Sequence, residues 1–271
     1  MRFDSDALGN RMKQYEGIEA NRTLIPRLPI MVRLDGKAFH TFTKGLKRPY
    51  DERFSNLMIE TTKFLVDKTN ARIGYVQSDE ISLVMHLEDI ESEPMFGGRI
   101  CKLTSVLASM CSVFFNSKLK EFVPEKANLL AYFDCRVWNV PDLTEAANVL
   151  VWRELDATKN AISMAAQSMF SHKQLQGKNG KEMQEMMHTK GINFNDYPSF
   201  FKRGTYLRKI TREVLFCMAA EISKLPAKHK ARLNPGLTVQ RSMVEKLDLG
   251  PILKYSNRVD VLFYGKGTIL I

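Results

Sequence analysis

Several familiar motifs are missing from this 271-residue sequence, and each absence excludes a class of protein. The cysteines form no C-x-x-C pair, which argues against a zinc knuckle or a redox site and favours reduced thiols; they are Cys101, Cys111, Cys135 and Cys217. The five histidines lack the H-E-x-x-H spacing of metalloproteases. No apolar run approaches the roughly 18–20 residues of a membrane span. The first residues carry acids and no apolar core, unlike a secretory signal. We therefore expect a cytoplasmic protein with no membrane association.

The glycine-rich loops that hold phosphates in many nucleotide-binding proteins are also missing. The chain contains neither G-x-x-x-x-G-K-[ST] nor G-x-G-x-x-G, and the segment 265–268 (Gly-Lys-Gly-Thr) lacks the upstream glycine. A nucleotide site in this chain would therefore depend on metal ions and on Lys and Arg side chains.

Basic residues are abundant and unevenly placed. The chain has 40 Lys and Arg against 30 Asp and Glu, a formal charge of +10. Residues 1–170 hold 22 basic and 22 acidic side chains, whereas residues 171–271 hold 18 and 8. Such an excess favours a polyanionic partner, with nucleic acid first and an acidic membrane second. A charge excess that only keeps the protein soluble is the alternative, and the pI alone does not decide between them.

Hydrophobic periodicity indicates an α+β fold with an antiparallel sheet. Short apolar runs at 29–35, 73–76, 81–85, 129–137, 205–210 and 259–264 predict strands. Helical spacing predicts helices at 51–68, 99–119, 142–170, 181–190 and 212–224. The order strand, helix, hairpin, helix, strand suggests helices packed on one face of the sheet. The polar, glycine-containing stretch at 174–180 is a weak module boundary. We therefore expect a catalytic core at 1–173 and a basic, mostly helical part at 174–271 that packs on it.

Acidic side chains end two of the predicted strands. Asp35 follows the first apolar run, and Asp79 and Glu80 lie in the turn between the next two. Two strands side by side would bring Asp35 and Asp79 to one sheet edge, where carboxylates repel each other until a cation joins them. Oxygen ligands of this kind suit Mg²⁺, and two such ions support phosphoryl transfer. Composition and spacing alone favour the alternative that these are two ordinary solvated turns, because Asp and Gly are common turn residues.

Cations surround these acids in the sequence. Arg33 alternates with Asp35 on its strand and so points to the same face. Each of the others is ordinary surface charge taken singly, but as a set they fit a triphosphate; they are Lys37, Arg99, Lys102 and Arg136.

Together these segments resemble the tRNA(His) guanylyltransferase family, including its guanylyltransferase-like members that repair tRNA 5′ ends. The first blocks are Arg33-Leu34-Asp35-Gly36-Lys37-Ala38-Phe39-His40-x-Phe42, Arg48-Pro49-x-Asp51 and Gln77-Ser78-Asp79-Glu80-x-Ser82. Further blocks are Arg99-x-x-Lys102-x-x-Ser105, Phe133-Asp134-x-Arg136-Val137, Trp152-Arg153-x-x-Asp156 and Lys202-Arg203-Gly204-Thr205. The resemblance covers about residues 5–210.

The resemblance implies a fold like the palm of polymerases and nucleotide cyclases, a homotetramer, and nucleotide addition in the 3′-to-5′ direction. ATP would activate the 5′ phosphate of a tRNA, and the 3′-hydroxyl of an incoming nucleotide, usually GTP, would attack it. Asp35, Gly36 through its carbonyl, and Asp79 would hold two Mg²⁺ ions, and Glu80 would support them or lie just outside their first shell of ligands.

The resemblance also assigns the neighbouring residues. The incoming nucleotide would contact Asp35, Gly36, Lys37, Ala38, Phe39, His40, Ser78 and Asp79. A second triphosphate or the activated end would bind Arg33, Arg99, Lys102 and Arg136. Lys202 and Arg203 are candidates to bind tRNA phosphates. We add Arg208 and Lys209, which follow them in the sequence.

One departure concerns the choice of tRNA. After Asp156, the eukaryotic tRNA(His) enzymes carry a His-Ile-Asn motif, whereas this chain reads Asn160-Ala161-Ile162-Ser163. The change favours the repair-type subclass over strict tRNA(His) specificity. A two-metal nuclease or cyclase on the same scaffold and a non-catalytic RNA-binding protein are the rival hypotheses, because a fold does not fix a reaction.

Overall fold

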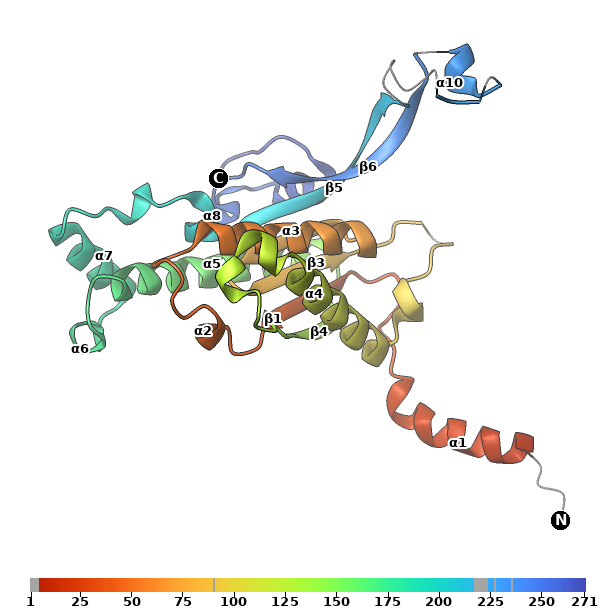
Figure 1. The fold of residues 1–271 in the computed structure, drawn as a ribbon, viewed down its shortest axis with the longest axis horizontal. Helices are drawn as coiled ribbons and strands as arrows, with labels where there is room; N and C mark the ends of the chain where they lie inside the picture. Colours follow the sequence, from red (N-terminus) through yellow and green to blue (C-terminus); the bar gives the residue numbers. More distant parts are fainter. Residues whose placement is uncertain (1–4, 90, 217–223, 227, 235) are drawn as a thin grey trace.

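A six-stranded antiparallel sheet forms the centre of the molecule (Figure 1). The computed structural model describes residues 5–89, 91–216, 224–226, 228–234 and 236–271. The strand order is β4-β1-β3-β2-β5-β6. The strands are β1 Ile30–Gly36, β2 Ile73–Gln77, β3 Glu80–Met85, β4 Phe133–Asn139, β5 Thr205–Leu215 and β6 Thr238–Leu247. The predicted α+β class and antiparallel sheet are confirmed.

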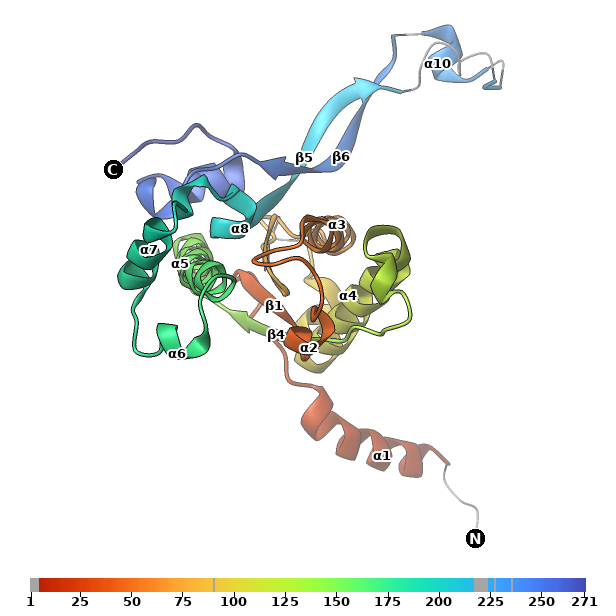
Figure 2. The same ribbon diagram turned by 60° about the vertical axis from the view of Figure 1, so that its left-hand side comes forward.

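Helices cover both faces of this sheet (Figure 2), so the expectation of helices on one face is wrong. α3 (Glu52–Thr69) and α4 (Ile100–Phe122) pack on one face, and α5 (Leu143–Gln167) packs on the other. The reason is visible in β1, where Val32 is buried with α3 and α4 while its neighbour Met31 is buried with α5. A strand buried on both sides reads as a continuous apolar run and does not alternate.

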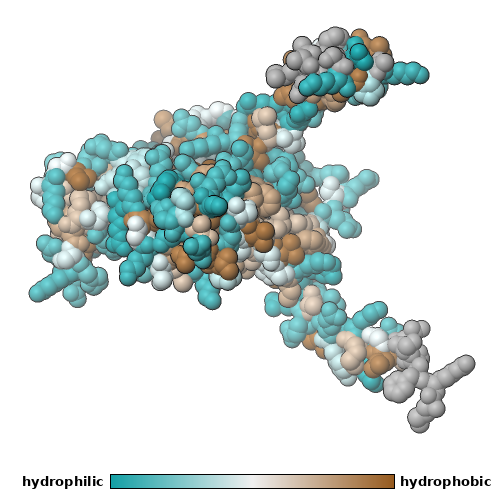
Figure 3. All heavy atoms as spheres, in the orientation of Figure 1, coloured by the Kyte–Doolittle hydropathy of each residue, from teal (hydrophilic) through white to brown (hydrophobic). Residues whose placement is uncertain are grey.

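The remaining helical segments surround this core. They are α1 Ser5–Ala20, α2 Phe39–Phe42, η1 Met95–Gly98, η2 Pro124–Lys126, α6 His172–Leu175, α7 Gly180–Thr189, η3 Phe194–Asp196, α8 Ser199–Arg203, α10 Lys230–Leu233, η4 Ile252–Lys254 and η5 Asp260–Tyr264. α1 extends away from the core in both ribbon views, and hydrophilic side chains cover most of the core in Figure 3. Among the described residues, α4 is the one helix that length and composition would allow to cross a membrane. One side of it packs on the sheet through Leu103, Leu107 and Phe115.

The basic C-terminal part contains two long strands as well as its short helices, and the strand predicted at 205–210 is confirmed as the start of β5. β5 pairs with β2 of the core, and the β5–β6 hairpin then rises away from it (Figure 1). Of the helix predicted at 212–224, residues 212–215 belong to β5, and 217–223 lie outside the described residues. The strand predicted at 259–264 is instead helical at η5. The division at residue 173 stays a prediction, although one continuous sheet joins the two parts.

A buried carboxylate ties the C-terminal segment to α5. Glu154 is 4% exposed and accepts hydrogen bonds from the Tyr206 hydroxyl and the Ile252 backbone N–H, both at 3.0 Å. Burial raises the pKa of Glu154 above its ordinary value, and the two hydrogen bonds oppose that shift. The charged form is therefore the costly one in the folded protein.

We expect Glu154→Gln to remove part of the pH dependence of stability. A carboxyl group whose pKa is raised by folding stabilises the protein fully below its ordinary pKa of 4.5 and less as pH rises through the raised value. Urea unfolding of both proteins across this range should show the wild type losing stability relative to the variant as pH increases. A difference in free energy of unfolding that is constant with pH would contradict this role for Glu154.

Candidate active site

The acidic edge of the sheet is built by the end of β1 and the β2–β3 turn. Asp35 stands opposite Glu80 of β3 on one side and Asp134 of β4 on the other. The Gly36 N–H donates to the Asp79 carbonyl at 3.2 Å, which fixes the turn against the strand end. Ser78 adopts a left-handed φ of 52°, the sharp turn that turns Asp79 back toward β1. The structure thus brings the Asp35 and Asp79 segments together, as the sequence predicts.

Gly36 has a steric reason to be glycine. A Cβ added there would lie 2.3 Å from the Phe39 ring, far inside contact distance. Ala38 then takes a left-handed φ of 57° and starts the short helix α2, which buries Phe39 and leaves His40 exposed. The backbone of the turn between β1 and α2 is therefore packed closely against Phe39 next to Asp35, and the Lys37 side chain in this turn is exposed.

The two acids are electrostatically unfavourable without a cation. Burial raises the pKa of Asp79 above its ordinary value, and the neighbouring charge of Asp35 raises it further. Within the described residues, no three His, Cys, Asp or Glu side chains gather as a complete metal site. Two converging carboxylates without further protein ligands are the donor set that suits Mg²⁺, because this ion commonly binds one or two carboxylates and completes its shell with water and substrate phosphates. The residues present therefore fit Mg²⁺.

Glu80 is already engaged by α5. Arg153 donates to both of its carboxylate oxygens, at 2.6 Å from Nε and 2.7 Å from Nη2, and also to Asp156 at 3.1 Å. The Glu80 and Arg153 side chains are only 17% and 13% exposed. Because both Glu80 oxygens accept hydrogen bonds, the structure favours the supporting role for this residue over that of a metal ligand.

A cavity of about 390 Å³ opens beside Asp79. It contains the predicted nucleotide contacts Phe39, His40 and Ser78. Its other walls are Thr43, Leu46, Lys47, Arg48, Pro49, Tyr50, Asp51, Phe54, Ser55, Gln77, Met164, Gln167, Phe200 and Phe201. Aromatic walls with two cations at the rim suit a nucleotide, since pockets of this size are largely apolar with a few placed polar groups.

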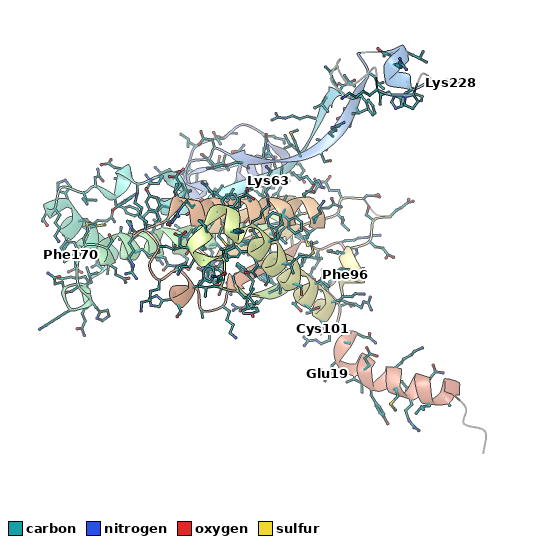
Figure 4. All side chains as sticks on the ribbon, in the orientation of Figure 1. Glu19, Lys63, Phe96, Cys101, Phe170 and Lys228 are labelled. Carbon is teal, nitrogen blue, oxygen red and sulfur yellow. The ribbon has the colours of Figure 1, made fainter. Side chains whose placement is uncertain are left out.

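The four cations predicted for a second triphosphate are divided by the sheet. Arg33 and Arg136 stand opposite each other on β1 and β4, and Arg136 pairs with Asp134 at 3.2 Å. Arg99 and Lys102 lie instead at the start of α4, on the other face. The Lys102 Nζ lies 5.3 Å from the centre of the Phe96 ring. Figure 4 shows Phe96 and Cys101 close to each other at the start of α4. Because the sheet lies between this pair of cations and the pair on β1 and β4, the four do not form a single site within one chain.

The tRNA candidates also differ from one another. Arg208 pairs with Glu245 at 3.4 Å, and Lys209 bonds the Asn70 side chain at 2.7 Å and pairs with Asp67 at 3.5 Å. Lys202 donates to the Asn195 carbonyl. Within the described residues, no ion pair or hydrogen bond engages the Arg203 guanidinium. Arg203 thus differs from the other three, although its charge is close enough to the buried Glu154 carboxylate to lower the pKa of that group.

Sequence reasoning did not assign several residues that shape this site. Arg153 holds Glu80, and Trp152 lies beside it with its ring centre 4.6 Å from the Arg153 guanidinium carbon. Lys47, Arg48 and Tyr50 line the cavity. Trp152, Arg153 and Arg48 fall inside family-like motifs, so those motifs were the available signal. Their distance along the chain from Asp79 hid their place in the site.

Comparison with known proteins shows the family to which the chain belongs. Residues 9–141 match the family model described as tRNAHis guanylyltransferase. The Saccharomyces cerevisiae tRNA(His) guanylyltransferase is 30% identical over 225 residues, which cover 76% of this chain and 93% of the yeast protein. A bacterial tRNA(His) guanylyltransferase-like protein, solved with ATP, has 41% identity and a TM-score of 0.70, covering 75% of this chain and 87% of its own. Another, solved with GTP, has 32% identity and a TM-score of 0.71, covering 92% and 94%. The chain belongs to the tRNA(His) guanylyltransferase family of nucleotidyltransferases.

Proposed function

We propose that this protein adds nucleotides, with GTP preferred, to the 5′ end of tRNA in the 3′-to-5′ direction after ATP activates the 5′ phosphate. The observation that carries the proposal is the meeting of Asp35 and Asp79 at one sheet edge, beside the cavity that contains Phe39, His40 and Ser78. The related bacterial structures contain ATP and GTP, which supports the same two nucleotides here. We place the activity in the cytoplasm and in a homotetramer.

Asp35, Asp79 and the Gly36 carbonyl would hold two Mg²⁺ ions. Bound there, the ions would activate the attacking hydroxyl and stabilise the leaving oxygen. Glu80 keeps the β2–β3 turn in place through its ion pair with Arg153. The protein therefore supplies carboxylates in fixed positions. The rate of the reaction then depends on how the two reactants are held relative to each other at these carboxylates.

The cavity orients the incoming nucleotide. Tyr50, Phe200 and Phe201 form a cluster of touching rings, with centres 5.3 and 4.9 Å from that of Tyr50. This apolar wall can hold a base, while Lys47 and Arg48 offer charge to the phosphates.

The stretch that replaces the His-Ile-Asn motif supports 5′-end repair over strict tRNA(His) recognition. Ala161 and Ile162 are buried in the cluster that α5 forms with α7 and α8. The Ser163 hydroxyl bonds the Lys159 carbonyl within the same helix. Two of the four side chains are therefore packed in the core and the third is hydrogen-bonded within its own helix. Asn160 is the exposed polar side chain that is left.

The test compares 5′ addition to intact tRNA(His) with addition to 5′-truncated tRNAs of other identities, given ATP, GTP and Mg²⁺. We expect longer products, with truncated tRNAs preferred. Shortened RNA or a cyclic nucleotide would overturn the proposal in favour of a nuclease or cyclase. RNA binding that persists in EDTA with no change of length would indicate a non-catalytic binder.

We expect tRNA binding to weaken steeply with salt, and Arg203→Ala to reduce that dependence. Each phosphate contact contributes about 0.9 to the slope of log K against log salt, so the slope should fall by about one. Lys209→Ala is the matched control, because Lys209 is held by Asp67 and Asn70. Filter binding at several salt concentrations measures both. Equal slopes for wild type and Arg203→Ala would remove Arg203 from the tRNA surface.

A further inference from the structure

Trp152 exposes a large aromatic surface close to the acidic edge. It is 52% exposed, and Leu155, one turn further along the same face of α5, is 44% exposed. The chain's other tryptophan, Trp138, is half-buried against the core cluster below α5. Tryptophan is costly to leave in water and is enriched where proteins bind partners.

Two guanidinium groups lie against this indole. The guanidinium carbons of Arg33 and Arg153 are 5.7 and 4.6 Å from the ring centre. The Arg33 Nε is buried and has no hydrogen-bond partner among the described residues, and Arg136 stands opposite Arg33 on β4. An aromatic face surrounded by arginines matches the arrangement by which proteins stack bases while holding the adjoining phosphates.

The position of Trp152 selects which reactant it can meet. Arg33 is two residues from Asp35 on the same face of β1, about 7 Å along the strand. Arg153 reaches the other side of the site through Glu80, which follows Asp79. The cavity beside Asp79 is the place that we propose for the incoming nucleotide. The open indole is left for the second reactant, the RNA end.

We propose that Trp152 is a stacking platform for the terminal base pair of the tRNA acceptor stem, with Arg33 and Arg136 binding the adjoining 5′ phosphate. The inference rests on the proposed function for the identity of the second reactant. An exposed, flat indole suits the end of a duplex, because the terminal pair presents an unstacked face while the internal pairs do not. Trp152 would thus set the height of the 5′ phosphate above Asp35.

Fluorescence tests this stacking without any catalysis. The chain has two tryptophans, so Trp138→Phe leaves Trp152 as the sole indole. The probes are an acceptor-stem RNA hairpin with a 5′-monophosphate at its open end, and a dumbbell of the same stem closed by loops at both ends. We expect the hairpin to quench Trp152 emission and the dumbbell to leave it unchanged. Should Trp138→Phe not fold, the difference in quenching between wild type and Trp152→Phe gives the same readout.

Substitution of the indole tests its contribution to binding. Trp152→Leu keeps an apolar side chain but removes the stacking face, so its Kd for the hairpin should rise about tenfold, while Trp152→Phe stays closer to wild type. Addition assays with Trp152→Leu should show a higher KM for the RNA, little change in kcat, and an unchanged KM for GTP.

Several results would overturn the inference. These are quenching by GTP or ATP alone, equal quenching by hairpin and dumbbell, and hairpin binding without quenching. A fall in kcat with an unchanged RNA KM would mean that Trp152 only positions Arg153. The proposed function fails separately, since end-dependent quenching in a protein that adds no nucleotide would keep the platform and remove the reaction.

Discussion

Asp79→Asn is expected to lower the rate of nucleotide addition by about 10³-fold. The substitution keeps the size of the side chain and removes the negative charge that, with Asp35, would hold the cations. Loss of several kcal/mol of charge stabilisation in the transition state corresponds to a rate change of this order. Single-turnover addition to a 5′-truncated tRNA at saturating ATP and GTP measures the effect. Full activity in the variant would show that Asp79 holds no metal.

The same substitution should stabilise the protein at neutral pH. The pKa of Asp79 is raised by burial and by Asp35, so the charged form carries a cost that asparagine lacks. A raised carboxyl pKa means that this contribution is most favourable below the ordinary value of 3.8 and is lost as pH increases through the raised value. The gain in the free energy of unfolding should therefore appear at pH 7 and shrink toward acid. Added Mg²⁺ should raise the Tm of the wild type more than that of the variant.

Asp67→Asn is the matched control for both effects. Asp67 lies on α3, and the charges of Lys68 and Lys209 hold its pKa below the ordinary value despite partial burial. The same chemical change there should leave activity intact and give no stabilisation at neutral pH. A simultaneous loss of activity and stability in Asp79→Asn, with Asp67→Asn unaffected, would indicate that Asp79 supports the fold and that its charge is not a cost.

Local patterns predicted the parts of the site that follow one another in the chain. Asp35 lies at the end of a short apolar run and Asp79 in the polar turn between two others, so their meeting could be expected. The face of the sheet on which α5 packs could not be predicted, because the apolar stripe of this helix fits either face. Because α5 lies on the face to which Glu80 points, Arg153 can reach Glu80. Because α4 lies on the other face, Arg99 is kept away from Arg33.

The C-terminal hairpin shows a different limit. Residues 205–215 mix β-branched, charged and apolar side chains, and β5 is buried only where it pairs with β2, near Thr205 and Leu207. Beyond that point the strand is held by β6, whose paired residues lie between 23 (Leu215 with Thr238) and 35 (Lys209 with Val244) positions further along the chain, in a pairing that no local pattern reports. The distribution of charge was readable, but which cations are neutralised was not: Arg208 and Arg212 share Glu245.

Arg153→Met should cost about 3–5 kcal/mol of stability, because it leaves the half-buried Glu80 carboxylate without its partner. The lost contacts are two short hydrogen bonds that join α5 to β3 at the acidic edge. Activity should fall as well, since the turn that presents Asp79 ends at the residue before Glu80. Urea unfolding and the tRNA addition assay measure the two losses. Lys118→Met, which breaks the exposed pair with Glu121, should change stability by at most about 1 kcal/mol.

A double variant separates the charge from the packing. Glu80→Gln combined with Arg153→Met removes the stranded carboxylate, so stability should recover by most of the loss, as when a buried ion pair is replaced as a unit. Activity should not recover, because the neutral pair no longer fixes the turn beside Asp35 by two hydrogen bonds. Arg153→Lys should also restore little, since an ammonium cannot engage both carboxylate oxygens in the planar geometry of arginine. Recovery of both stability and activity in the double variant would mean that the ion pair serves the fold alone and that the catalytic edge is set by β1.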